Sequence, residues 1–321
     1  MRATGGWRAG AGRGDKGAMA GPMSPRIWGL LILLSVIWGA SFFFAAIALT
    51  GFPPFTIVLG RVAIAAVALA VACRIAGLTL PRGREQWIAV AGMGLFNNVL
   101  PFTLIVLGQT FIPSGLAAVV NAATPVFAVL CLHVMTQDDR LRPNTLAGAL
   151  TGLVGVAILA GPAAFATGRG GELVGIALCL GACLTYGISA VWARRLRSTG
   201  LPPLSVAAGQ CMSSTLMMLP LVLVFDRPWA LPAPPVEAAA ALIGFGLIST
   251  GLAYALFFAI MARAGATNAM LVTLLVPVTA LMLGTLVLGE QLAARHVLGM
   301  AVIGLGLLLI DGRLARRFRA R

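Results

Sequence analysis

Charged side chains are scarce in this sequence. Only 10% of its 321 residues are Asp, Glu, Lys or Arg and nine of them are acidic, whereas 60% of the residues are hydrophobic. With a mean hydropathy of +0.98, the chain has far too little polar surface to cover a soluble globule of this length. The composition therefore predicts an all-α integral membrane protein.

Acidic side chains are also absent from the middle of the apolar runs. Glu172, Glu290 and Asp311 lie near the ends of runs, as do His133 and His296. A proton-driven pump commonly uses a buried carboxylate or histidine that titrates during its cycle. Facilitated diffusion or exchange is therefore favoured over proton antiport.

Motifs for catalysis are lacking as well. The sequence shows no P-loop, and no nucleophile, acid–base pair or metal-ligand cluster stands out. Asp138 and Asp139 beside Arg140 are interpreted as a solvated connector, and the five cysteines as small hydrophobes in or next to apolar runs. We expect no enzyme activity, no metal and no cofactor; an enzyme acting on lipid-linked substrates and a channel or scaffold remain the alternatives to a carrier.

Apolar runs long enough to cross a bilayer recur along the whole chain. Ten spans are predicted, at residues 27–49, 55–73, 87–107, 116–135, 146–160, 173–192, 204–225, 238–260, 269–288 and 297–310. With a cytoplasmic N-terminus, 19 of the 23 Lys and Arg residues fall on the inner side, and only Arg169, Arg227 and Arg295 on the outer side. Cytoplasmic loops retain positive charge, so both termini are expected in the cytoplasm and the protein in a bacterial inner membrane.

The net charge of +14 does not indicate nucleic acid, because the basic residues are divided among many short loops. Residues 1–26 are basic but have no apolar core before a cleavage site, so they are expected to be disordered rather than a signal peptide. Met19 and Met23 are alternative start sites. Residues 312–321 form a basic cytoplasmic tail.

The second half of the sequence repeats the first. WGAS at 38–41 corresponds to YGIS at 186–189, GFPPFTIVLG at 51–60 to GLPPLSVAAG at 200–209, and GLAAVVNAATPVFAVL at 115–130 to TNAMLVTLLVPVTALM at 267–282, with offsets of 148 to 152 residues. Each repeat, 27–164 and 172–311, contains five predicted spans. An odd number of spans gives the two repeats opposite orientations, an arrangement typical of transporters that alternate access to a midplane site.

These motifs, together with LGEQL at 288–292 before a glycine-rich last helix, resemble the EamA family of the drug/metabolite transporter superfamily. The resemblance covers about residues 27–311 in two copies. It implies ten helices, cytoplasmic termini, export or exchange of small metabolites, and a central cavity surrounded by the first, third, fourth, sixth, eighth and ninth spans. It does not imply a substrate.

Polar residues within spans are costly unless they face a partner or a cavity. The candidate substrate-binding residues are Trp38, Ser41, Arg61, Asn97, Asn98, Asn121, Tyr186, Ser249, Thr250, Tyr254 and Thr273. The asparagines and hydroxyls offer donors and acceptors for an amide, an amino acid, a nucleoside or a similar small molecule. The alternatives are that the asparagines bridge helices and that Trp38 packs in the core instead of stacking on a flat or cationic substrate.

Arg61 is the one basic residue inside a span. Its repeat counterpart is Gln210, and no buried carboxylate is available as its partner. Two interpretations remain: a structural role in holding a neighbouring helix, and substrate contact or gating. Pro125 and Pro277 occupy matched positions and are candidate hinges. The glycines of the fifth and tenth spans are interpreted as packing positions, including a candidate homodimer face.

Overall fold

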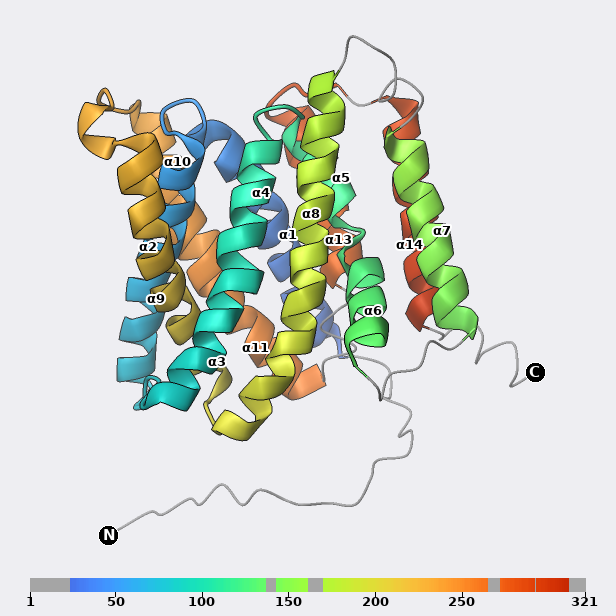
Figure 1. The fold of residues 1–321 in the computed structure, drawn as a ribbon. Helices are drawn as coiled ribbons and strands as arrows, with labels where there is room; N and C mark the ends of the chain where they lie inside the picture. The colour runs from blue at the N-terminus through green and yellow to red at the C-terminus, as the bar shows by residue number, and fades with distance from the viewer. Residues whose placement is uncertain (1–23, 137–142, 161–169, 265–271, 292, 312–321) are drawn as a thin grey trace, which may run out of the picture.

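The computed structural model describes residues 24–136, 143–160, 170–264, 272–291 and 293–311, and these residues form helices and no strand (Figure 1). The α-helices are α1 (Pro25–Ala48), α2 (Pro54–Ile75), α3 (Arg84–Gly94), α4 (Leu100–Gly108), α5 (Ser114–Asn121), α6 (Thr124–Met135), α7 (Pro143–Ala160), α8 (Gly170–Trp192), α9 (Pro203–Leu221), α10 (Val236–Gly246), α11 (Ala253–Ala264), α13 (Val272–Leu286) and α14 (Ala294–Asp311). The π-helical segments are η1 (Leu95–Val99), η4 (Val222–Asp226) and η6 (Leu247–Leu252), and the 3₁₀ segments are η3 (Ala193–Thr199) and η5 (Pro228–Ala230).

The prediction of an all-helical membrane protein is confirmed by this architecture. Seven helical segments of the described chain are long and apolar enough to cross a membrane, and three shorter apolar helices, Leu146–Ile158, Leu275–Leu286 and Ala294–Gly306, accompany them. The count of ten spans therefore stays a prediction. Of the predicted disordered segment 1–26, only the last three residues are described: Pro25 begins α1, and Ser24 Oγ accepts a hydrogen bond from the backbone N–H of Ile27. The predicted tail 312–321 lies outside the described residues.

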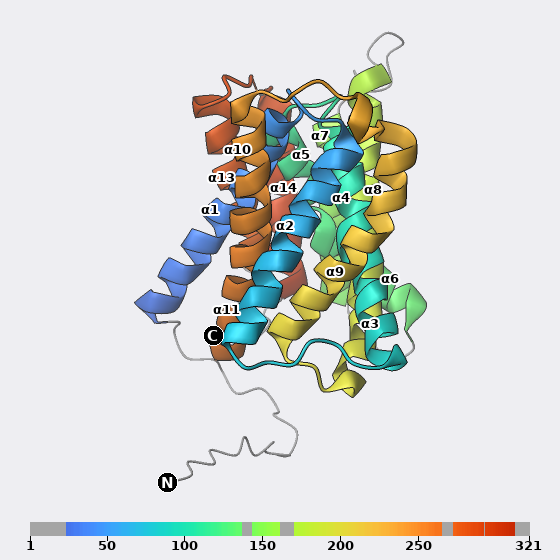
Figure 2. The same ribbon diagram turned by 90° about the vertical axis from the view of Figure 1, so that its left-hand side faces the viewer.

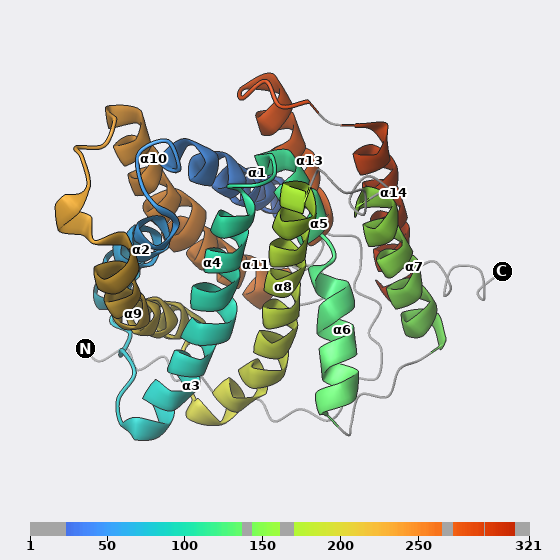
Figure 3. The ribbon, with the colours of Figure 1, turned by 45° about the horizontal axis from the view of Figure 1, so that its top comes forward.

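Corresponding helices of the two halves run in opposite directions. In Figures 1 and 2, α1 starts at the lower end of the bundle, whereas α8 starts at the upper end and runs down. Figure 3 shows α7 and α14, the last helix of each half, lying side by side at one edge of the bundle. This arrangement fits two five-helix repeats of opposite orientation.

The glycine of the WGAS and YGIS motifs allows a close helix crossing in each half. A Cβ atom on Gly39 would overlap the side chain of Thr279 in α13, and one on Gly187 would lie 2.8 Å from the carbonyl oxygen of Phe127 in α6. At the first crossing, Thr279 Oγ1 donates to the carbonyl oxygen of Ser35 over 2.7 Å. Each motif thus marks a close contact between the first helix of its own repeat and the fourth predicted span of the other repeat.

The two ends of the bundle differ in charge. At the basic end, where α3 begins and α8 ends, lie Arg82, Arg84, Arg194 and Arg195. The opposite end, where α2, α5 and α8 begin, is termed the acidic end because three carboxylates tie helices together there.

Each of these carboxylates bonds to a different helix. Glu290 accepts from the backbone N–H groups of Ser114 and Gly115 at the start of α5, at 2.7 and 2.8 Å. Asp226 accepts from both the backbone N–H and the hydroxyl of Thr56 at the start of α2, at 2.6 and 2.8 Å. The acidic end is therefore held by links that join the two repeats.

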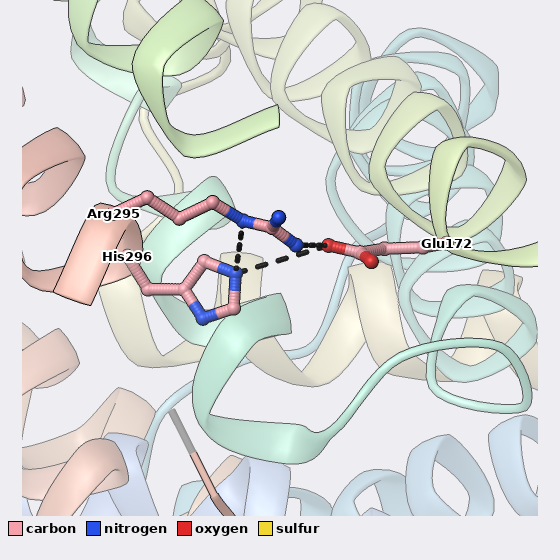
Figure 4. Close-up of polar contacts among 3 residues, drawn as sticks. All are labelled: Glu172, Arg295 and His296. Carbon is pink, nitrogen blue, oxygen red and sulfur yellow. Dashed lines mark hydrogen bonds and ion pairs between the residues drawn. The ribbon is translucent and has the colours of Figure 1, made fainter. Parts of the chain in front are cut away.

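The third carboxylate, Glu172, links α8 to α14. Its Oε1 atom lies 2.5 Å from Nη2 of Arg295 and 3.8 Å from Nε2 of His296, and Arg295 Nε lies 3.2 Å from the same His296 nitrogen. Figure 4 shows the three side chains facing one another. The imidazole is buried and the arginine half-buried. This contact fixes the start of the last helix against the start of the second repeat.

The outer surface of the bundle is apolar. Large hydrophobic side chains such as Val67, Ile75, Leu216 and Leu286 are between 67% and 83% exposed. A soluble protein rarely exposes so much apolar surface, whereas a bilayer covers it. The core instead consists of clusters rich in alanine and valine, which let the helices approach closely.

Candidate functional site

Two π-helical segments occupy matched positions in the repeats. η1 interrupts the predicted third span between α3 and α4, and η6 interrupts the predicted eighth span between α10 and α11. Their first residues, Leu95 and Leu247, lie 152 residues apart. Each segment follows a glycine, Gly94 or Gly246, with the same offset. Segments of π-helix inside α-helices frequently occur at functional sites. Their recurrence in both halves makes this depth of the bundle a candidate for the functional site.

These two glycines lie against corresponding points of neighbouring helices. A Cβ atom on Gly94 would sit 2.9 Å from the carbonyl oxygen of Gln210 in α9, and one on Gly246 would sit 3.1 Å from the carbonyl oxygen of Arg61 in α2. Arg61 and Gln210 are themselves repeat counterparts. The same crossing is thus built twice, and it brings the side chains of η1 and η6 against α9 and α2.

A chain of neutral hydrogen bonds runs through the crossing at η1. Asn97 Nδ2 donates to the hydroxyl of Tyr254 at 3.2 Å, and that hydroxyl donates to Asn98 Oδ1 at 2.8 Å. Asn98 Nδ2 donates to Ser214 Oγ at 3.1 Å, and Ser214 donates to the carbonyl oxygen of Gln210 at 2.6 Å. Asn98 and Ser214 are fully buried, so an unsatisfied polar group there would be costly.

This series of hydrogen bonds ends on a more accessible side of the bundle. Asn97, Tyr186 and Tyr254 are only half-buried, whereas Asn98 is not exposed at all. Ser189 of α8 lies here too, with Oγ 3.3 Å from Asn97 Oδ1 and its proton directed to the carbonyl oxygen of Tyr186 at 2.7 Å. We refer to Asn97, Asn98, Ser189, Ser214 and Tyr254 as the central polar cluster; it draws on both repeats.

Arg61 lies beside this cluster and is 7% exposed. Its guanidinium carbon is 3.5 Å from the ring centroid of Phe102 and 4.2 Å from that of Phe245, and its Nε donates to Thr250 Oγ1 at 2.8 Å. No carboxylate of the described chain forms an ion pair with it. Two aromatic faces and a hydroxyl therefore take the place of an acidic partner.

Aromatic rings connect α1 with the cluster. The ring centroids of Trp38 and Phe257 are 5.4 Å apart, those of Phe257 and Phe258 5.6 Å, and those of Phe258 and Tyr254 6.4 Å. Trp38 also packs against the core. The series extends the polar cluster by an apolar wall.

Other predicted site residues lie apart from the cluster. Ser41 donates to the carbonyl oxygen of Trp38 in its own helix at 2.6 Å, and the fully buried Ser249 donates to that of Ile37 at 3.0 Å. Asn121 ends α5, where its Oδ1 is 3.4 Å from Thr124 Oγ1. Thr273 is half-buried near the start of α13.

The two matched prolines occupy different local structures. Pro125 stands at the start of α6, directly after the fourth span is interrupted at residues 122–123, whereas Pro277 lies inside α13. The first therefore marks a break between two helices, and the second removes one hydrogen bond within a helix.

Ser214 belongs to the central polar cluster and donates to the backbone carbonyl of Gln210, although neither residue was among the predicted site residues. A serine or glutamine in a span otherwise rich in serine gives no direct signal for a role. The repeat offered one clue, because it places Gln210 opposite Arg61, the other conspicuous polar residue at this level. Among the described residues, no group of three or more His, Cys, Asp or Glu could hold a metal ion.

Comparison with protein families identifies the chain. The model of the EamA-like transporter family matches it twice, over residues 26–161 and 173–311. The chain belongs to this family. The family match agrees with the resemblance seen in the sequence and with the two halves of the helical bundle.

Two relatives of this EamA-family transporter match most of its length. A "Probable terminal-alkyne amino-acid exporter" of Streptantibioticus cattleyicolor is 28% identical over 92% of this chain and 97% of its own. A "Probable amino-acid metabolite efflux pump" of Escherichia coli is 24% identical over 87% of this chain and 92% of its own. A crystal structure 21% identical in sequence has a TM-score of 0.64 and covers 92% of this chain and 99% of that one, which shows a shared fold.

Proposed function

We propose that this transporter moves an amino acid or a similarly small metabolite across a bacterial inner membrane by alternating access, as an exporter or exchanger with both termini in the cytoplasm. The observation that carries the proposal is the central polar cluster, to which η1 of the first repeat and α8, α9 and α11 of the second contribute. The printed names of two relatives, an amino-acid exporter and an amino-acid metabolite efflux pump, support this substrate class.

The chemistry of the cluster suits a zwitterion without net charge. Asn97 and Tyr254 are half-buried and supply an amide N–H, an amide oxygen and a phenolic hydroxyl. Amide and hydroxyl donors can bind a carboxylate, and the amide oxygen can accept from an ammonium group. The aromatic series from Trp38 to Tyr254 offers an apolar wall for the side chain of the substrate.

Alternating access needs elements that can change shape in both halves. The interruptions of regular α-helix at η1 and η6 and the prolines Pro125 and Pro277 supply such points at corresponding levels. Because the repeats have opposite orientations, exchanging their conformations would open the cluster to one side of the membrane and then to the other.

The cluster and its neighbours hold no acidic side chain within the described residues. Arg61 is held by two rings and a hydroxyl, an arrangement that suits a role in positioning α2 against η6. Facilitated exchange therefore fits the site better than obligatory proton antiport.

Counterflow in proteoliposomes tests the proposal. Vesicles loaded with an unlabelled amino acid should accumulate the same labelled amino acid transiently and saturably, for at least one member of a panel covering small, aliphatic and aromatic side chains. Asn97→Ala should reduce this uptake about tenfold or more, whereas Ser41→Ala, whose hydroxyl bonds within its own helix, should leave it within about twofold. Uptake that never saturates would indicate a channel, and no counterflow by folded protein with any amino acid would refute this substrate class.

The coupling mode is tested with the same vesicles. An imposed pH gradient should change the initial rate by less than about twofold if no proton is moved with the substrate. A strong acceleration by the gradient would contradict exchange without protons.

A further inference from the structure

A cavity lies at the basic end of the bundle, apart from the central polar cluster. It has a volume of about 180 Å³ and is lined by Glu85, Ile88, Ala89, Arg195 and Ser198. Its two walls are the first turns of α3 and the 3₁₀ segment η3, which lie next to each other at the lower edge of Figure 1. Nothing in the proposed transport cycle uses it.

The walls of this cavity are held at a fixed spacing. Trp192 Nε1 donates to the carbonyl oxygen of Ala89 at 2.9 Å, and Gln86 Nε2 donates to that of Thr199 at 3.0 Å. Gly92 allows the first contact, because a Cβ atom there would overlap the Trp192 ring. The cavity is thus part of the packed structure of the protein.

Opposite charges line the cavity without neutralising each other. The guanidinium carbon of Arg195 lies 4.1 Å from the ring centroid of Trp192, which orients the group. Glu85, in the first turn of α3, is exposed. Neither residue takes part in an ion pair in the part of the chain that the structure describes. A ligand that carries both a negative and a positive group could therefore pair with each of them.

The position of the cavity favours a lipid over a solute. Ile88 lines it and is 47% exposed, and the neighbouring Trp87 is 37% exposed. Tryptophan is enriched at the level of the lipid headgroups, so an exposed Trp and Ile at the end of a span indicate the membrane interface. The cavity is thus reachable from the lipid at headgroup depth.

We propose that this cavity binds the headgroup of phosphatidylethanolamine. Arg195 donates N–H groups to the phosphate, and the primary ammonium donates to the carboxylate of Glu85 and to Ser198 Oγ, whose own proton goes to the Arg195 carbonyl oxygen. Phosphatidylglycerol brings no ammonium to Glu85, and the choline of phosphatidylcholine has no N–H to donate. The site therefore discriminates among phospholipids by the ammonium as well as by the phosphate.

Thermal unfolding of the delipidated full-length protein in detergent tests this inference. Dioleoyl phosphatidylethanolamine should raise the unfolding temperature at a concentration about tenfold lower than the concentration at which phosphatidylcholine or phosphatidylglycerol with the same acyl chains gives the same rise. Glu85→Gln and Arg195→Gln should each reduce this preference to about threefold or less. Both side chains are exposed, so neither variant should impair folding. Arg74→Gln and Glu237→Gln, which remove exposed charges outside the cavity, should keep the full preference.

The variants also separate the two halves of the headgroup. Glu85→Gln should increase the stabilisation by phosphatidylglycerol relative to the other lipids, because it removes the charge that repels an anionic lipid. Arg195→Gln should reduce the stabilisation by every phospholipid. Equal stabilisation by phosphatidylethanolamine and phosphatidylcholine, or an unchanged preference in Glu85→Gln, would overturn the inference. Soluble phosphoethanolamine acting at the same concentration as the lipid would also overturn it, since the occupant would then be a solute.

Discussion

Arg61 Nε donates a hydrogen bond to Thr250 Oγ1 across 2.8 Å, and this contact joins α2 of the first repeat to η6 of the second. The hydroxyl of Thr250 in turn donates to the carbonyl oxygen of Phe245, five residues back near the end of α10, at 3.2 Å. The ring of Phe245 also covers one face of the guanidinium. The side chain of Arg61 and the π-helical segment are therefore parts of one arrangement.

We predict that Arg61→Gln destabilises the protein by about 3 kcal/mol, because it removes two cation–π contacts and a charged hydrogen bond from a buried position. Arg61→Lys should recover only part of this loss, since an ammonium group cannot stack flat between two rings. Thermal unfolding in detergent measures both. Arg74→Gln, at the exposed end of the same helix, is the matched control and should be neutral. An Arg61→Gln variant as stable as the wild type but inactive in counterflow would assign Arg61 to substrate contact instead.

Tyr254 provides a second prediction, because its hydroxyl is the only atom that bonds both Asn97 and Asn98 among the described contacts. Tyr254→Phe should cost about 1–2 kcal/mol in stability by leaving the buried oxygen of Asn98 without this donor. It should also weaken transport by about tenfold or more, mainly through KM if the hydroxyl contacts the substrate in every state.

The matched control is Tyr186→Phe, since no hydrogen bond of the Tyr186 hydroxyl is found in the described structure. This variant should have an unfolding temperature close to that of the wild type without substrate. Its counterflow kinetics then report on direct substrate contact alone. Equal losses of stability in the two variants would show that the hydroxyl of Tyr254 contributes nothing through the asparagines.

The sequence predicted which residues gather in the central polar cluster better than it predicted how their side chains are directed. Asn97, Asn98 and Tyr254 could be selected because polar side chains stand out in apolar spans and because each has a repeat counterpart. The π-helical turns that set their directions could not be predicted, since a helix that is apolar on nearly all sides shows little periodicity to reveal an extra residue. For the same reason Ser41 was grouped with them, although its hydroxyl bonds within its own helix.

Gly94 and Gly246 explain why the third and eighth spans approach their neighbours so closely, and they give a steric prediction. Gly94→Ala and Gly246→Ala should each lower stability by about 1–3 kcal/mol, because the new methyl groups would press on the carbonyl oxygens of Gln210 and Arg61. Gly304→Ala is the control: its Cβ atom would meet nothing within 4 Å, and alanine favours a helix by up to about 1 kcal/mol. If all three substitutions behaved alike, close approach at the two matched glycines would not be required for folding.

Glu290 should act as a joint between the two repeats at the acidic end. Its two carboxylate oxygens accept from the first N–H groups of α5, where a helix has unpaired donors and a partial positive charge, so the contact is stronger than an ordinary surface hydrogen bond. Glu290→Gln keeps one acceptor oxygen and should cost about 1 kcal/mol, whereas Glu290→Ala removes both and should cost about 2 kcal/mol or more. Glu237→Gln, at the exposed start of α10, should be neutral in stability.

Because this joint must stretch or break if the acidic end opens during transport, the two Glu290 variants should also raise the reactivity of a cysteine placed at Ser114 toward a membrane-impermeant maleimide. A graded loss of stability without any rise in labelling would mean that the joint stays closed throughout the cycle and that opening takes place between other helices.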